Sequence, residues 1–109
     1  MDELREWLVG NGFKIYANND KDNLCDWYAG RRAETDKECG CNDHPPQIIV
    51  KPYIIAMNDG NRYKSVEVEL VGEDYGLWWN FSVYSLSPKE LMENLGMIEE
   101  RLVKAWELK

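Results

Sequence analysis

The sequence has little of the material from which several common classes of protein are built. It holds three cysteines and one histidine in 109 residues, and no apolar run approaches the ~20 residues needed to cross a bilayer. The N-terminus lacks a basic segment followed by an apolar one, so no secretory signal peptide is expected. We therefore expect a cytosolic protein with no membrane partner, whose thiols stay reduced and form no structural disulfide.

Positive charge is also scarce. The chain has 13 Lys and Arg against 20 Asp and Glu, which gives a formal net charge of −7, and Arg31 and Arg32 are its only adjacent basic pair. A phosphate backbone would be repelled by such a field. Direct binding of nucleic acid is therefore not expected, whereas the charge is compatible with a basic protein partner.

Hydrophobic residues, by contrast, are plentiful. They make up 44% of the chain and include five Trp and six Tyr, which is ample for a packed interior. The length is close to that of one ordinary domain, and no repeat or linker interrupts the sequence. We expect a single domain over residues 1–109.

Hydrophobic periodicity predicts an α+β fold. The expected architecture is a five-stranded, mostly antiparallel sheet with a short N-terminal helix and a long C-terminal helix packed on one face. The predicted elements are a helix over 2–9, strands over 12–18, 24–32, 47–57, 63–71 and 77–86, and a helix that begins at residue 88. The polar stretch 33–46 is expected to form one long loop.

Three residues give finer expectations about these elements. Ser87, followed by Pro88 and then by Glu90, predicts a capping box at the start of the last helix. Gly96 lowers helix propensity by about 1 kcal/mol relative to Ala, which indicates close contact with the sheet at that point. Pro52 has no N–H for a sheet hydrogen bond, so its strand is expected at a sheet edge or at a bulge.

Alternation along residues 77–86 separates the aromatic residues onto two faces. Trp79, Phe81 and Val83 are expected on the core face, and Trp78 and Tyr84 on the opposite face. Tyr53 and Tyr63 from neighbouring strands would lie beside this second pair. Exposed Trp and Tyr on a flat sheet suit a protein-binding hot spot. The alternative is that the 33–46 loop or a second copy in a homodimer covers this face.

Acidic residues on one strand allow two further interpretations. Glu67 and Glu69 share a face about 7 Å apart; a solvated strand face explains them better than a proton-transfer pair, and we place them in the protein-binding face. They are also spaced somewhat like phosphates, which suggests a nucleic-acid mimic as an alternative, together with the C-terminal helix acids Glu90, Glu93, Glu100 and Glu107. Interleaved basic residues favour ordinary surface pairs instead.

A second candidate site combines Cys25 with Cys39, Cys41 and His44. Thiolates and a neutral imidazole are the ligands of tetrahedral zinc, which would stabilise the 33–46 loop. Against zinc, the two loop cysteines are separated by a single residue, and Cys25 would serve equally as a small buried hydrophobe. His44 is the only candidate base for a nucleophilic cysteine and lies on a loop, so no catalytic residues are expected.

Several segments resemble small hypothetical proteins encoded by tailed phages and prophages. They are the stretch around residues 19–32, "IIVKPY", and the C-terminal run from "SVEVELV" through "YSLSPKEL" to "RLVKAWE". The resemblance implies an accessory phage product made in a bacterial host cytosol, but it carries over no activity or catalytic residues. We therefore expect a non-enzymatic protein without cofactor that binds a host or phage protein and blocks a host enzyme or defence complex. The zinc module and the nucleic-acid mimic are the alternatives.

Overall fold

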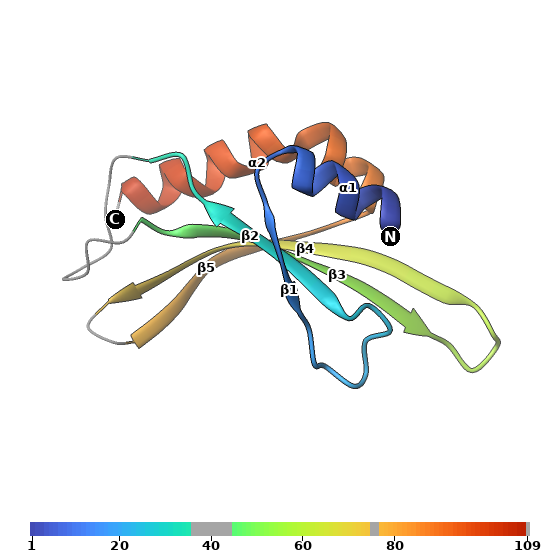
Figure 1. Cartoon of the computed structure of the whole chain (residues 1–109). Helices are drawn as coiled ribbons and strands as arrows, with labels where there is room; N and C mark the ends of the chain where they lie inside the picture. Colours follow the sequence, from blue (N-terminus) through green and yellow to red (C-terminus); the bar gives the residue numbers. More distant parts are fainter. Residues whose placement is uncertain (36–44, 75–76, 109) are drawn as a thin grey trace.

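The computed structural model describes residues 1–35, 45–74 and 77–108, which form two helices and five strands (Figure 1). The predicted α+β fold class is confirmed. In chain order the elements are α1 (Asp2–Gly10), β1 (Lys14–Ala17), β2 (Trp27–Arg32), β3 (Gln47–Ala56), β4 (Arg62–Asp74), β5 (Leu77–Leu86) and α2 (Pro88–Glu107).

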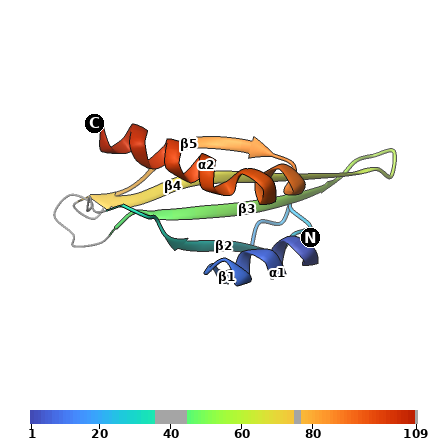
Figure 2. The same cartoon turned by 90° about the horizontal axis from the view of Figure 1, so that it is seen from above.

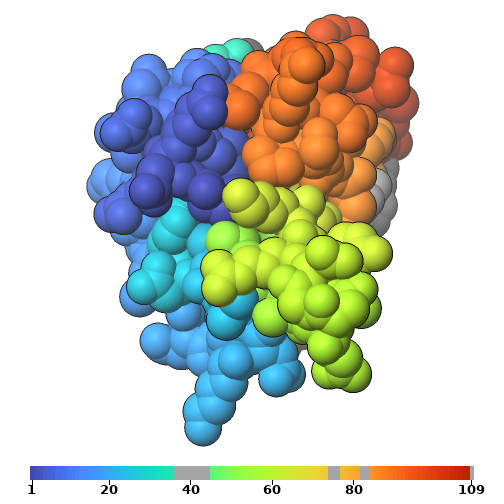
Figure 3. All heavy atoms as spheres, turned by 90° about the vertical axis from the view of Figure 1, so that its right-hand side faces the viewer, coloured from blue at the N-terminus to red at the C-terminus, as the bar shows by residue number. Residues whose placement is uncertain are grey.

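The sheet is a simple meander. Its spatial order is β1-β2-β3-β4-β5, and every neighbouring pair is antiparallel. Both helices lie on the same side of the sheet (Figures 1 and 2), and seen from one end they lie next to each other above the β3–β4 hairpin (Figure 3). We call this side the helix side and the other the open face, because no described element covers the latter.

The core lies between the helices and the sheet. The apolar stripe of α2 is buried and consists of Leu91, Leu95, Ile98, Leu102 and Trp106. It packs with β4, whose inward residues Val66, Val68 and Leu70 are fully buried. None of the described helices is long and apolar enough to span a membrane.

The start of α2 is the capping box that the sequence predicts. The Glu90 backbone N–H donates to Ser87 Oγ at 3.1 Å, and the Ser87 N–H donates to Glu90 Oε1 at 3.3 Å. Each contact satisfies an N–H that a helix terminus would otherwise leave unpaired. The cap fixes where α2 begins and hence how its apolar stripe meets the sheet.

Pro52 lies in the central strand and pairs with Val66 in regular register, so the prediction of a sheet edge or a bulge is wrong. The pairing of β2 with β3 runs from Arg32 and Gln47 to Ala29 and Val50, and it stops before Pro52. There the Pro52 carbonyl accepts a hydrogen bond from Asn23 Nδ2 at 2.8 Å. Because the N–H and C=O of one strand residue point to the same side, the missing donor faces this connection rather than β4. A proline is therefore tolerated on a locally unpaired border of a central strand.

Gly96 does not contact the sheet, contrary to the prediction. The residue is exposed on α2, and a Cβ added to it would meet no atom within 4 Å. The weak helix propensity of glycine at this position has no packing role among the described residues.

A bulge in β5 places Tyr84 on the helix side, so its predicted exposure on the open face is wrong. Leu70 pairs with Phe81 and the preceding Glu69 pairs with Val83, which leaves residue 82 as an extra residue. One extra residue inverts the alternation beyond it. Tyr84 therefore pairs with Val68 and packs against the core. The predicted core position of Val83 concerns a side chain outside the described part of the structure.

A buried ion pair joins β2 to α2. Arg31 donates to both carboxylate oxygens of Glu99 at 2.5 and 3.0 Å, and the Glu34 backbone N–H donates to the same carboxylate at 3.0 Å. The guanidinium also lies over the ring of Phe13, 4.8 Å from its centroid. These contacts compensate the burial of Glu99, which is only 5% exposed.

Candidate functional site

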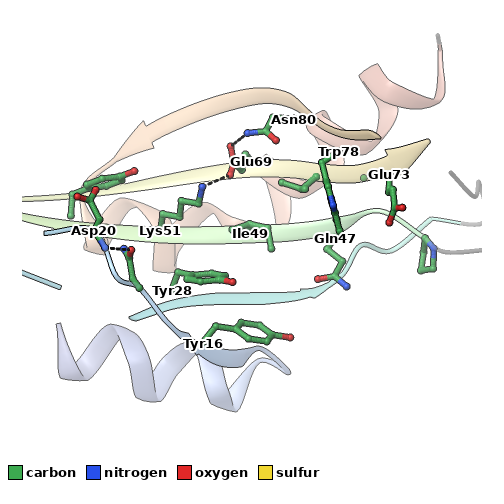
Figure 4. Close-up of a pocket in the computed structure, with 15 residues that line it drawn as sticks. Tyr16, Asp20, Tyr28, Gln47, Ile49, Lys51, Glu69, Glu73, Trp78 and Asn80 are labelled. Atoms are coloured by element: carbon green, nitrogen blue, oxygen red, sulfur yellow. Dashed lines mark hydrogen bonds and ion pairs between the residues drawn. The ribbon is translucent and has the colours of Figure 1, made fainter. Parts of the chain in front are cut away.

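The open face is hollowed. All five strands contribute to a cavity of about 840 Å³, whose lining includes aromatic, amide and charged side chains (Figure 4). In Figure 1 both ends of the sheet bend away from the helices, which gives this face its concave shape. Concave sites of this size, with a few polar groups among aromatic ones, are the usual form of a binding site.

Aromatic side chains stand on two sides of the hollow. Tyr16 and Tyr28 are direct partners on β1 and β2, and their rings stack with centroids 5.2 Å apart. Trp78 rises from β5 on the other side and points across the sheet toward Gln47 (Figure 4). The Trp78 side chain is 72% exposed, and its neighbour Leu77 is 74% exposed.

The floor of the hollow depends on a glycine. Gly30 on β2 pairs with Ile49 on β3, and a Cβ at Gly30 would lie 2.9 Å from Ile49 Cδ1 and 3.5 Å from Tyr16 Cε2. The absence of a side chain lets both neighbours lie close to the β2 backbone. Gly30 thereby keeps this part of the open face deep.

A buried charge network occupies the middle of the hollow. Glu69 on β4 is 4% exposed; Lys51 Nζ lies 3.0 Å from its Oε1, and Asn80 Nδ2 donates to its Oε2 at 2.9 Å. Burial lowers the pKa of Lys51, but the hydrogen bond and charge of Glu69 outweigh it, so the net pKa is raised. Lys51 is therefore held as a cation, and its ammonium forms an ion pair with Glu69.

Two further acids of β4, Glu67 and Glu73, lie on this face. Burial and the adjacent Glu67 carboxylate both raise the pKa of the Tyr53 phenol, which stays neutral as a result. Glu73 on β4 is half-buried, pairs directly with Trp78 and forms no hydrogen bond or ion pair with another described residue. The described residues of the lining thus include three carboxylates, those of Asp20, Glu69 and Glu73, and one ammonium, that of Lys51.

The open face brings together most of the residues predicted to bind protein. Of the six, Trp78, Tyr53 and Glu69 line the hollow, while Glu67 and the 63% exposed Tyr63 lie on the same face outside it. Tyr84 is the exception. Sequence reasoning missed Tyr16, Tyr28 and Glu73, although the first two alternate with the inward Ile15 and Ala29 and could have been assigned to this face from that pattern.

Comparison of the chain with protein-family models, with curated proteins and with solved structures found no match. The site is therefore interpreted from its own chemistry. Exposed aromatic rings can stack or bury apolar groups of a ligand, and the polar side chains among them can fix its orientation.

The zinc prediction stays a prediction, because Cys39, Cys41 and His44 lie outside the described residues. Cys25 comes just before β2, whereas Thr35 and Pro45, which border residues 36–44, lie beyond the other end of that strand. The Cys25 thiol is buried and donates to the Trp27 carbonyl at 3.7 Å, and burial raises its pKa. Within the described ranges, no three Cys, His, Asp or Glu side chains are grouped to hold a metal.

The acidic residues considered for a nucleic-acid mimic lie on opposite sides of the molecule. Glu67 and Glu69 belong to the open face, and Glu69 is covered and paired with Lys51. The exposed acids of α2 are on the helix side, where Glu100 pairs with Lys104 at 2.6 Å. Two separated groups with local counter-ions do not form a continuous row of phosphate-like charge, so this geometry does not favour a mimic.

Proposed function

We propose that this protein acts by binding another protein through the open face of its sheet and catalyses no reaction. The observation that carries the proposal is the exposure of Trp78, which is 72% exposed at the border of an aromatic hollow. Tryptophan is the residue type most enriched among binding hot spots, and an indole left in water gains free energy when a partner covers it.

The shape and composition of the face support a macromolecular partner. The open face extends beyond the hollow of about 840 Å³ to Tyr63, which is 63% exposed. Aromatic residues at the centre with polar groups around them are the usual arrangement of a protein interface. The resemblance to phage-encoded proteins points to a host or phage protein in a bacterial cytosol as the partner, and to inhibition of a host enzyme or defence complex as the effect.

A capture experiment with matched variants tests the proposal. The immobilised chain, Trp78→Ala and Met97→Ala are each exposed to bacterial lysate, and the retained proteins are quantified by mass spectrometry. Met97 is the control because it is also an exposed apolar residue, 45% exposed, but lies on the helix side. We expect Trp78→Ala to weaken retention by about thirty-fold or more, as hot-spot residues do, and Met97→Ala to retain the wild-type set.

Stability and mass measurements complete this test. Because Trp78 is exposed, Trp78→Ala should change the free energy of unfolding by no more than about 0.5 kcal/mol. Equal retention by the two variants would contradict binding through the open face. Light scattering separates the second-copy alternative: a dimer that Trp78→Ala converts to monomer identifies another copy of this chain as the occupant.

A further inference from the structure

Trp78 and Glu73 form an aromatic and anionic pair at the border of the hollow. They are direct cross-strand partners on the open face, which places their Cβ atoms about 5 Å apart. The Glu73 carboxylate has no hydrogen-bond or ion-pair partner among the described residues, although the side chain is half-buried. A partly desolvated carboxylate without a counter-ion favours a cation brought by a ligand.

The other charges of the hollow do not supply that cation. Among the described residues of the lining, Lys51 is the only ammonium, and it is bound to Glu69, which also accepts a hydrogen bond from the amide of Asn80. With Glu69 neutralised in this way, Glu73 and Asp20 leave the hollow negative. The net charge of −7 on the whole chain adds to the attraction for a positive group.

We propose that the hollow takes an arginine side chain of the partner, with its guanidinium stacked on the Trp78 indole and bonded to the Glu73 carboxylate. This inference rests on the proposed protein-binding function and names the chemistry that the partner presents. A guanidinium fits both groups at once, because it stacks on aromatic faces within about 6 Å of the ring centroid and donates two parallel hydrogen bonds to a carboxylate. The amide of Gln47, to which Trp78 points in Figure 4, adds an acceptor beside it.

The test uses a matched pair of short peptides and the whole chain. One peptide is acetyl-Gly-Gly-Arg-Gly-Gly-amide, and the other carries citrulline, which has the shape of arginine without its charge. Binding is followed by NMR at the indole N–H of Trp78, identified by its loss in Trp78→Phe. We expect the arginine peptide to shift this signal in a saturable way and the citrulline peptide to leave it in place.

Two acid variants locate the carboxylate. Glu73→Gln and Glu6→Gln remove the same charge, but Glu6 is an exposed residue of α1 on the helix side. We expect Glu73→Gln to weaken arginine binding by about ten-fold or more, the loss of a charge-assisted pair, and Glu6→Gln to leave it unchanged. Thermal melting of both variants checks that they are folded, and the citrulline comparison stands on the wild-type chain alone.

The inference is overturned if the arginine peptide causes no shift, if citrulline shifts the signal equally, or if the two acid variants behave alike. Its failure is distinguishable from failure of the proposed function. A partner that is lost from Trp78→Ala but retained by Glu73→Gln leaves protein binding in place and removes arginine from it. A partner that Trp78→Ala retains as well as Met97→Ala does overturns both.

Discussion

Arg31 of β2 and Glu99 of α2 form a two-point ion pair in the layer between the sheet and the helix. The pair joins strands to helix at a point where both side chains are largely removed from water. Breaking such a pair leaves a buried charge without compensation, which costs more than the pair contributes over two apolar residues.

Glu99→Ala should therefore destabilise the fold strongly. We expect a loss of about 3 kcal/mol in the free energy of unfolding, at the low end for buried pairs because Arg31 keeps some exposure. Urea unfolding measures it, with Glu100→Ala as control, since Glu100 forms an exposed pair with Lys104 and should leave the urea midpoint nearly unchanged. Arg31→Met combined with Glu99→Leu should recover most of the loss. Equal midpoints for Glu99→Ala and Glu100→Ala would show that the pair is not structural.

Gly96→Ala should stabilise the protein. The residue is exposed in the middle of α2, and an added Cβ would meet nothing within 4 Å. Alanine lowers the entropy of the unfolded chain and favours the helix by about 1 kcal/mol relative to glycine. Thermal and urea unfolding should both show the gain. A loss of stability would mean that this part of α2 contacts something that requires glycine.

Alkaline pH should weaken the fold through Lys51 and Tyr53. Both pKa values are raised above their ordinary values of 10.5 and 10.0, so the folded state binds these protons more tightly than the unfolded state. Their contribution to stability is complete below the unfolded pKa and is lost as pH rises through the folded pKa. We expect the free energy of unfolding to fall above about pH 10, and Tyr53→Phe to reduce that slope. An unchanged slope in Tyr53→Phe would contradict this assignment.

Much of the fold could be predicted from local chemistry. The order of helices and strands and the capping box at Ser87 follow from the properties of neighbouring residues, and both have the predicted form. Trp78 lies on the open face as the alternation predicts, because the bulge at residue 82 comes after it in the strand.

The predictions that the structure contradicts concern features that depend on contacts between distant segments. The bulge that turns Tyr84 inward arises from the pairing of β5 with β4, and an alternating pattern in one strand does not reveal it. Pro52 is tolerated because Asn23, 29 positions earlier in the chain, bonds to its carbonyl. The pattern of its own strand predicts a solvated Glu69. The side chain is buried because Lys51 and Asn80, from the two neighbouring strands, bind its carboxylate.

Cys25→Ala should leave any bound zinc in place. The Cys25 thiol is buried at the end of β2 that lies away from Thr35 and Pro45, and burial holds its pKa above the ordinary value, which disfavours a thiolate ligand. Elemental analysis of wild type and Cys25→Ala, both purified without chelator, makes the comparison. A stoichiometric zinc content that disappears in Cys25→Ala would establish the predicted four-ligand site against this expectation.

The central claim is that the open face is the part of the molecule that touches the partner. Site-specific photocrosslinking tests it most directly, with benzoylphenylalanine placed at Ser85, an exposed open-face residue opposite Glu67, or at Met97 on the helix side. After irradiation in lysate, we predict a covalent adduct to a defined protein from Ser85 and none from Met97. Adducts from Met97 alone would contradict the account.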